Sequence, residues 1–139
     1  MFSLTEEQKL FRDSIRDFAK NVVEPRAAEI DESGEFPWDM VEKLRENDFL
    51  ALPFDEEYGG QGADLLTLCV AIEELAKVCV NTSLILGCQE LGSTPIKLAA
   101  TPEQKKKYIP PLARRGGGLG AAAICGGGGQ GDAVIVKVD

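Results

Sequence analysis

The sequence contains no histidine among its 139 residues. A Ser-His-Asp triad, a Cys-His pair and a His-containing zinc site each need an imidazole as base or ligand, so the chain provides none of them. Its four cysteines, Cys69, Cys79, Cys88 and Cys125, lie 10, 9 and 37 positions apart, which fits no CxxC metal or redox motif. We therefore predict no metal site, and we interpret the cysteines as small buried apolar residues in a reducing compartment.

The sequence also lacks long hydrophobic runs and an excess of basic residues. No stretch approaches the roughly 20 apolar residues that cross a bilayer. Glu6 and Glu7 lie within an N-terminal amphipathic pattern, which is not typical of a signal peptide. The formal net charge is -8, and this opposes binding to nucleic acid because phosphate contacts depend on Lys and Arg. We predict a soluble, cytoplasmic protein with no nucleic-acid partner and no membrane insertion.

Helical periodicity is strongest in the N-terminal third and in the middle of the chain. Thr5 and Gln8 form a capping box that predicts a helix start, and Pro25 should end or kink this helix near Glu24. We expect a short helical turn over residues 26–30 and a polar loop over 31–35. Pro37 then suits the first turn of a helix that stops near Asn47. The first helix has one apolar stripe, made by Phe11, Ile15, Phe18 and Val22.

The middle of the chain predicts a loop followed by core helices. We expect residues 49–54 to be buried and extended, and the glycines of residues 59–62 to adopt positive φ or to approach other atoms closely. Asp64 should cap a core helix whose apolar positions include Leu65, Leu68, Cys69 and Leu75. Residues 81–99 are apolar on more than one face, which predicts a central helix surrounded by others. Thr101 and Pro102 start the last helix.

The composition changes abruptly at residue 116, with nine glycines in residues 116–131. Two β-prone pieces remain there, at residues 119–125 and 133–138. Gly126, Gly128 and Gly131 formally satisfy GxGxxG, but a true dinucleotide fingerprint opens a helix, and the residues that follow here favour a strand. A glycine-rich, flexible tail is the alternative interpretation.

Six motifs then follow one another in a recognisable order. They are Leu4–Gln8 (LTEEQ), Pro25–Asp31 (PRAAEID), Phe36–Pro37, Pro53–Gly62 (PFDEEYGGQG), Ile72–Ala76 (IEELA) and Thr101–Tyr108 (TPEQKKKY). In this order they resemble the N-terminal domain of acyl-CoA dehydrogenases, with short-chain or butyryl-type members closest. The resemblance implies a mainly α fold, with an orthogonal helical bundle over residues 1–115 and the start of a middle β-domain over 116–139.

The resemblance also implies a function. Family enzymes bind FAD, oxidise an acyl-CoA to the trans-2-enoyl-CoA, pass electrons to electron-transfer flavoprotein and commonly form homotetramers. The family's catalytic glutamate lies in the C-terminal region, beyond residue 139, so we assign no catalytic residue in this chain. We interpret Glu73, Glu74, Glu90 and Glu103 as solvated helix-face or capping carboxylates. The alternative function is a non-catalytic helical module for protein–protein interaction.

Site residues are carried over from the resemblance by position. Family members usually have a flavin strand that here corresponds to Leu119–Ala133 (LGAAAICGGGGQGDA), with Cys125 in place of a threonine and Gly131 in place of a serine. Ile124, Cys125 and Gly131 are accordingly the cofactor-binding positions, although we expect the isolated chain to bind FAD poorly and to turn over nothing. The substrate-pocket positions are Ser83, Leu84, Gly87 and Leu91, for which ordinary core packing is the alternative.

Overall fold

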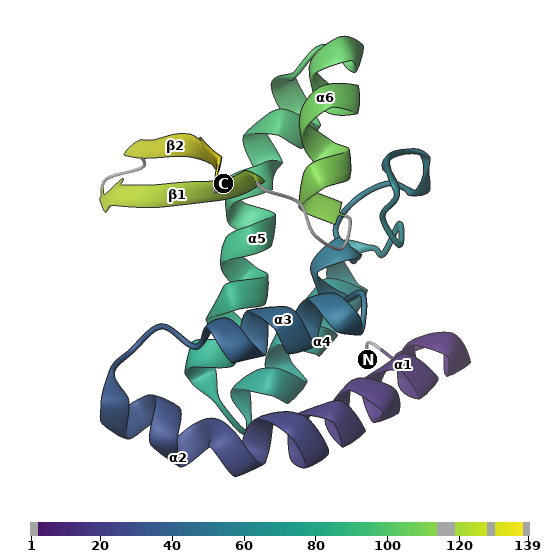
Figure 1. Cartoon of the computed structure of the whole chain (residues 1–139). Coiled ribbons are helices and arrows are strands. Elements are labelled where there is room, and N and C mark those ends of the chain that lie inside the picture. Colours follow the sequence, from purple (N-terminus) through teal and green to yellow (C-terminus); the bar gives the residue numbers. More distant parts are fainter. Residues whose placement is uncertain (1–2, 114–118, 128–129, 138–139) are drawn as a thin grey trace. The chain divides into compact units, whose positions relative to one another are not determined.

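The computed structural model describes residues 3–113, 119–127 and 130–137, and for the last two ranges it describes the backbone alone. Helices dominate the described residues, and a two-stranded hairpin follows them (Figure 1). The elements are α1 (Glu6–Phe18), a π-helical turn (Ala19–Val23), α2 (Glu24–Ser33), α3 (Trp38–Glu46), α4 (Leu65–Ala76), α5 (Val80–Ala99), α6 (Pro102–Ala113), β1 (Leu119–Gly127) and β2 (Gln130–Lys137). Over residues 3–113, no helix is both long and apolar enough to cross a membrane.

The chain divides into two compact units, each of which is described by itself. The first unit combines Met1–Lys43 with Asp64–Ile85, and the second combines Leu44–Ala63 with Leu86–Asp139. The predicted mainly α class is confirmed for the described part of the chain. The predicted domain boundary at residues 115 and 116 falls within 114–118, outside the described residues, and stays a prediction.

In the first unit, the helix start predicted at Thr5 is confirmed. The amide of Gln8 donates to Thr5 Oγ1 at 3.1 Å, and the amide of Thr5 donates to Gln8 Oε1 at 3.1 Å. Pro25 does not interrupt the path of the chain: it lies in the first turn of α2, directly after a π-helical turn. A π-helical turn joins α1 to α2, and the amide of Glu24 donates to the carbonyl of Ala19.

The segments on either side of Pro25 correct two predictions. The helix continues to Ser33, so the predicted loop over residues 31–35 was wrong at residues 31–33 and correct at 34–35. Gly34, with φ of 65°, ends the helix in the left-handed region. The π-helical turn also changes which side chains are buried, because its extra residue rotates the following positions around the axis. Val23 is fully buried, while the predicted Val22 is only half-buried.

Helices α1 and α4 pack together in the first unit through Asp64 and an apolar face. Asp64 Oδ1 accepts from the amide of Thr67 at 2.7 Å, which confirms the predicted cap, and Gln8 Nε2 donates to Asp64 Oδ2 at 3.3 Å. The buried face of α4 includes Leu68, Val70, Ala71 and Leu75. The predicted face was wrong at Leu65, which is 69% exposed, and at Cys69, which is also exposed.

We expect Asp64→Ala to lower the free energy of unfolding by about 1 kcal/mol, because it removes the cap of α4 and the acceptor of Gln8. Hydrogen bonds from Thr67 hold the pKa of Asp64 below its usual range, so the carboxylate form does the capping at neutral pH. Urea unfolding followed by circular dichroism measures the loss. Asp64→Asn is the matched control, since its amide oxygen keeps a cap acceptor; equal losses in both variants would contradict the capping role.

In the second unit, a tight loop replaces the extended stretch predicted for residues 49–54. Residues Phe49–Ala51 form a 3-10 turn, and the chain then turns again through Phe54. The segment is folded back on itself because the amide of Gln61 donates to the carbonyl of Ala51 at 3.0 Å and that of Gly62 to the carbonyl of Phe54 at 2.8 Å. The prediction of burial was correct, whereas the extended backbone was wrong.

The core of the second unit joins this loop to α6. Its buried members are Ala51, Phe54, Tyr58, Ile109, Leu112 and Ala113, and Ile96 of α5 packs against them. Strands β1 and β2 follow as an antiparallel pair, in which Cys125 lies opposite Gly131 and Ile124 opposite Asp132. A β-bulge interrupts the register between Cys125 and Gly127. That this hairpin begins a middle β-domain stays a prediction.

Candidate functional site

The four predicted substrate-pocket residues all lie on α5, but they do not share one environment. Leu84 and Leu91 are each 55% exposed, and Gly87 is half-buried. Their spacing of three and four residues places them along one side of the helix. The prediction that α5 is a central helix surrounded by others was wrong for this side, since Leu98 is also 81% exposed.

Ser83 differs from the other three predicted pocket residues. It is 3% exposed, and its hydroxyl donates to the carbonyl of Val80 at 2.7 Å within the helix. Thr82, its neighbour, is fully buried and donates to Cys79 Sγ at 3.4 Å. The structure therefore groups Leu84, Gly87 and Leu91 on the exposed side of α5 and places Ser83 in the packed part of the first unit.

The hairpin brings the three predicted cofactor positions together at the level of the backbone. Ile124 and Cys125 are consecutive on β1, and Gly131 of β2 is the register partner of Cys125. The register of the pair shifts next to them, between Cys125 and Gly127, as it does at a β-bulge. The antiparallel pairing, which the sequence does not specify by itself, is what makes these positions neighbours.

The residues at the hairpin fit a flavin only in part. A flavin ring is held in place by hydrogen bonds to its nitrogen and carbonyl groups, and the bulged backbone can donate or accept such bonds. Hydroxyl donors are missing, however, because the sequence places Cys125 and Gly131 at the two positions in question. Flavin binding at the described hairpin therefore stays a prediction, and no chemical step is assigned to it.

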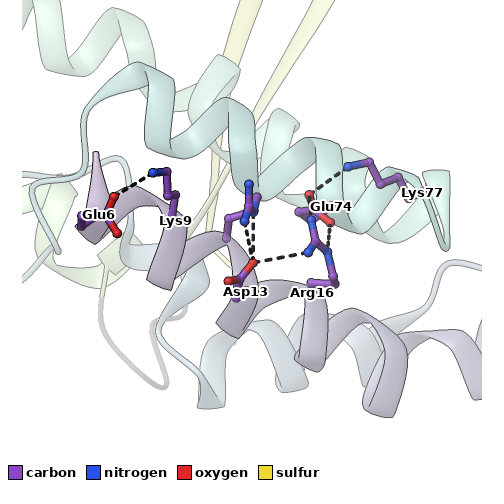
Figure 2. A network of polar contacts seen from close by, with 7 residues as sticks. Glu6, Lys9, Asp13, Arg16, Glu74 and Lys77 are labelled. Carbon is purple, nitrogen blue, oxygen red and sulfur yellow. Dashed lines mark hydrogen bonds and ion pairs between the residues drawn. The ribbon is translucent and has the colours of Figure 1, made fainter. Parts of the chain in front are cut away.

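Among the four glutamates expected to be solvated or capping carboxylates, Glu74 differs most from the prediction. It is 3% exposed, so its interpretation as a solvated carboxylate was wrong. Its two carboxylate oxygens accept from Arg16 Nε and Nη2 of α1, both at 3.0 Å, and Lys77 Nζ donates to Oε1 at 2.8 Å. Figure 2 shows Arg16 reaching from α1 to Glu74 on α4, with Asp13 on the other side of the guanidinium. This bidentate pair joins the two helices.

The electrostatics of this network follow from its geometry. Hydrogen bonds from Arg16, and further ones from Lys77, lower the pKa of Glu74 from 4.5 to about 2, against the opposing effect of burial. The same contact raises the pKa of Arg16. A carboxylate held ionised in this way accepts a proton poorly, so Glu74 is unsuited to act as a general base.

The other three glutamates are structural as well. Glu73 is 67% exposed and pairs with Lys77 at 2.8 Å, as expected of a helix-face carboxylate. Glu90 is only 22% exposed, and its oxygens accept from Lys97 Nζ at 3.0 and 2.7 Å. Backbone and Thr101 hydrogen bonds at the start of α6 lower the pKa of Glu103, which agrees with a capping role. Each of these three side chains thus has a structural contact of its own.

The thiols and polar groups give no sign of a metal site within the part of the chain that the structure describes. Cys69, Cys79 and Cys88 are free, and no group of three or more His, Cys, Asp or Glu residues there is arranged to hold a metal ion. Cys79 is buried as predicted, but Cys69 and Cys88 are exposed, which corrects the prediction for both. The side chain of Cys125 lies outside the described residues.

Comparison with known proteins gives a consistent result. The family described as "Acyl-CoA dehydrogenase, N-terminal domain" matches residues 5–116. Over 109 residues, the chain is 46% identical to the short-chain-specific acyl-CoA dehydrogenase of Clostridium acetobutylicum, covering 78% of this chain and 29% of the relative. It is 38% identical to the probable acyl-CoA dehydrogenase YngJ of Bacillus subtilis over 109 residues, which cover 78% of this chain and 29% of that relative.

Solved structures agree with the sequence relatives. Butyryl-CoA dehydrogenase from Megasphaera elsdenii matches with a TM-score of 0.73 and 31% identity, covering 81% of this chain and 30% of that one. A chain from a structural study of the electron transferring flavoprotein of Acidaminococcus fermentans matches with a TM-score of 0.78 and 38% identity. The match covers 87% of this chain and 32% of that one. The present chain thus spans less than a third of the length of these relatives.

Proposed function

Because this chain belongs to the acyl-CoA dehydrogenase family, whose N-terminal domain it contains, we propose that it is the N-terminal part of an FAD-dependent acyl-CoA dehydrogenase. The complete enzyme oxidises a short-chain acyl-CoA to the trans-2-enoyl-CoA and passes the electrons to electron-transfer flavoprotein. The observation that carries this proposal is the 46% identity to a short-chain-specific family member over 109 residues.

The exposed side of α5 supports an apolar substrate. Leu84 and Leu91 are each 55% exposed, and Gly87 between them adds no side-chain bulk. A hydrocarbon chain binds such a surface because contact removes apolar area from water, at about 25 cal/mol per Å². In the proposed enzyme, this face lines the acyl part of the substrate, and the CoA phosphates are bound elsewhere.

The properties of Glu73, Glu74 and Glu90 favour the proposal that the catalytic base lies outside this chain. Removing the α proton of a thioester requires a base that is desolvated and whose pKa is near the working pH. Glu74 has a pKa of about 2, while Glu73 and Glu90 are held in ion pairs with lysines. We therefore place the base downstream of residue 139, as the family pattern implies.

FAD, when bound, supplies the acceptor for the hydride that leaves the β carbon. The contribution proposed for this chain is positional: backbone groups near Cys125 and Gly131, which are register partners, contact the ring. Both positions lack hydroxyl donors, and most of a family enzyme lies outside this chain. Residues 1–139 alone are accordingly expected to bind FAD weakly.

Partner binding is proposed for the outer surface of the first unit. Leu10 of α1 is 73% exposed, and Leu65 and Leu66 of α4 are 69% and 49% exposed. Exposed apolar side chains of this size are typical anchors for a protein partner, here electron-transfer flavoprotein.

Homotetramer formation and a cytoplasmic location are proposed for the complete enzyme. The free thiols of Cys69, Cys79 and Cys88 agree with a reducing compartment.

The test is the flavin absorbance spectrum and the intact mass of the natural protein. We expect a yellow protein with about three times the 15.0 kDa of this chain, as the 29% coverage of its relatives implies. Butyryl-CoA added without oxygen should bleach the flavin, and electron-transfer flavoprotein should then reoxidise it. Residues 1–139 expressed alone are the control, with no turnover expected.

A colourless natural protein of 15.0 kDa would overturn the enzyme proposal. The exposed leucines of the first unit would then favour the second candidate, a non-catalytic helical module that binds another protein. A yellow protein that butyryl-CoA fails to bleach, but that a longer acyl-CoA bleaches, would keep the dehydrogenase and correct its substrate range.

A further inference from the structure

The connection between α2 and α3 (Figure 1) carries two aromatic side chains that are exposed in the first unit. Phe36 is 55% exposed, and Trp38, the sole tryptophan of the sequence, is 67% exposed. Their ring centroids lie 4.7 Å apart in an edge-on arrangement, so the two rings form one continuous aromatic surface. Exposed rings that contact each other in this way are typical anchors of an interaction surface.

The sequence around this aromatic pair is strongly acidic. Residues 27–42 contain six carboxylates and no lysine or arginine. Asp31, Glu32 and Glu35 are exposed, and no ion pair among the described residues 3–113 involves any of them. The three carboxylates lie within the seven residues that precede Trp38, so the negative charge borders the exposed rings.

Short-range hydrogen bonds hold the aromatic pair in place. Gly34 ends α2 with a left-handed φ of 65°, and the amide of Trp38 then donates to the carbonyl of Phe36 at 3.0 Å. Arg26 Nε of α2 donates to Asp39 Oδ2 of α3 at 2.8 Å, which joins the two helices across the connection. Because the backbone is fixed in this way, binding a partner there costs less conformational entropy than ordering a flexible loop would.

The charge of this surface decides which class of partner it fits. Anionic lipids and nucleic acids are repelled by the carboxylates, so the exposed rings do not suit a membrane or a phosphate backbone. A cationic side chain suits both parts of the surface, because the ring faces attract a cation and the carboxylates pair with it. Arginine fits better than lysine, since its planar guanidinium stacks on aromatic rings and binds a carboxylate through two N–H groups.

We propose that the Phe36–Trp38 pair and the carboxylates of residues 31–35 form a docking surface for an arginine-rich segment of a partner protein. The guanidinium groups stack on the rings, and the carboxylates neutralise their charge. This surface shares no residue with the exposed leucines of α1 and α4. It uses neither flavin nor acyl-CoA, so the inference is independent of the proposed function.

The test is a titration of the full-length natural protein with hexaarginine, hexalysine or hexaglutamate, followed by tryptophan fluorescence. Subtracting the same titration of Trp38→Phe isolates the signal of Trp38. We expect hexaarginine to shift the Trp38 emission and to bind about fivefold more tightly than hexalysine. Raising NaCl from about 50 mM to about 500 mM should weaken this binding at least tenfold, because the charges are exposed. Hexaglutamate should leave the emission unchanged.

Two triple variants separate this surface from acidic charge in general. The first neutralises the carboxylates beside the rings and should weaken hexaarginine binding about tenfold; it combines Asp31→Asn, Glu32→Gln and Glu35→Gln. The matched control removes the same charge from residues 55–57, which are exposed carboxylates next to Tyr58, a ring that is only 7% exposed. It should leave the dissociation constant within about twofold, and it combines Asp55→Asn, Glu56→Gln and Glu57→Gln.

Each half of the aromatic pair is tested by a single substitution. Phe36→Ala should weaken hexaarginine binding about fivefold, as the loss of one ring contact with a cation predicts. Trp38→Ala, measured by calorimetry because it removes the fluorescent group, should do the same. Both side chains are exposed, so the variants should keep the circular dichroism spectrum of the native protein.

Four results would overturn the inference. They are a Trp38 emission that hexaarginine does not change, equal affinity for hexalysine, an equal loss of affinity in the control variant at residues 55–57, and a Trp38 emission that shifts with protein concentration before any peptide is added. The last would mean that a second copy of the chain covers the rings. Flavin bleaching by butyryl-CoA in the same samples tests the proposed function separately, and it should be unchanged in Phe36→Ala.

Discussion

Replacing Gly60 by alanine is expected to lower the free energy of unfolding by more than about 3 kcal/mol, the range of severe backbone conflicts. A Cβ at this position would lie 1.9 Å from the carbonyl oxygen of Phe54 and 2.3 Å from its carbonyl carbon. These are backbone atoms of a residue that is 1% exposed, so they have no free space to move into. The same carbonyl accepts from the amide of Gly62 at 2.8 Å, and a shift would break that bond.

Gly34→Ala provides the matched control for this prediction. Gly34 has φ of +65°, yet nothing lies within 4 Å of its added Cβ. Its substitution should therefore cost only the left-handed backbone conformation, about 1–2 kcal/mol. Urea unfolding monitored by circular dichroism compares the two variants. If Gly60→Ala lost no more stability than Gly34→Ala, the close approach of Gly60 to Phe54 would be refuted.

Features that depend on local chemistry were predictable from the sequence. Thr5 with Gln8 and Asp64 with Thr67 lie three residues apart, so each cap is complete within one turn of helix. The glycines of residues 59–62 were also interpreted correctly, because positive φ and close approach both select for a missing Cβ. Such signals need no knowledge of the rest of the fold.

Features that depend on distant residues were not predictable in the same way. The burial of Glu74 requires Arg16, which is 58 positions away in the sequence, and periodicity alone makes Glu74 look like a solvated carboxylate. The side of α5 that stays exposed is likewise set by packing, so helical spacing alone could not have shown that Ser83 is buried while Leu84 and Leu91 are exposed. The antiparallel register that places Cys125 opposite Gly131 also depends on pairing between strands.

The second large effect is expected for Glu74→Gln, which should lower the free energy of unfolding by about 2–3 kcal/mol. Removing one partner of a buried pair costs about 3–5 kcal/mol, and the loss is smaller here because Arg16 and Lys77 can still reach water. Their side chains are 39% and 51% exposed, against 3% for Glu74. Glu73→Gln is the control on the same helix: Glu73 is 67% exposed, so its loss should stay below about 0.5 kcal/mol.

The pH dependence of this difference tests whether the ionised form of Glu74 causes the stabilisation. The pKa of Glu74 is lowered from 4.5 to about 2 in the folded chain, so folding favours the ionised form. Its stabilising effect is fully present above pH 4.5 and is lost as the pH falls from 4.5 towards 2, because the unfolded chain then binds the proton first. Unfolding free energies of the native chain and of Glu74→Gln should therefore converge over this range. A difference that stayed constant from neutral pH to about pH 2 would show that the stabilising effect of Glu74 does not come from its ionisation.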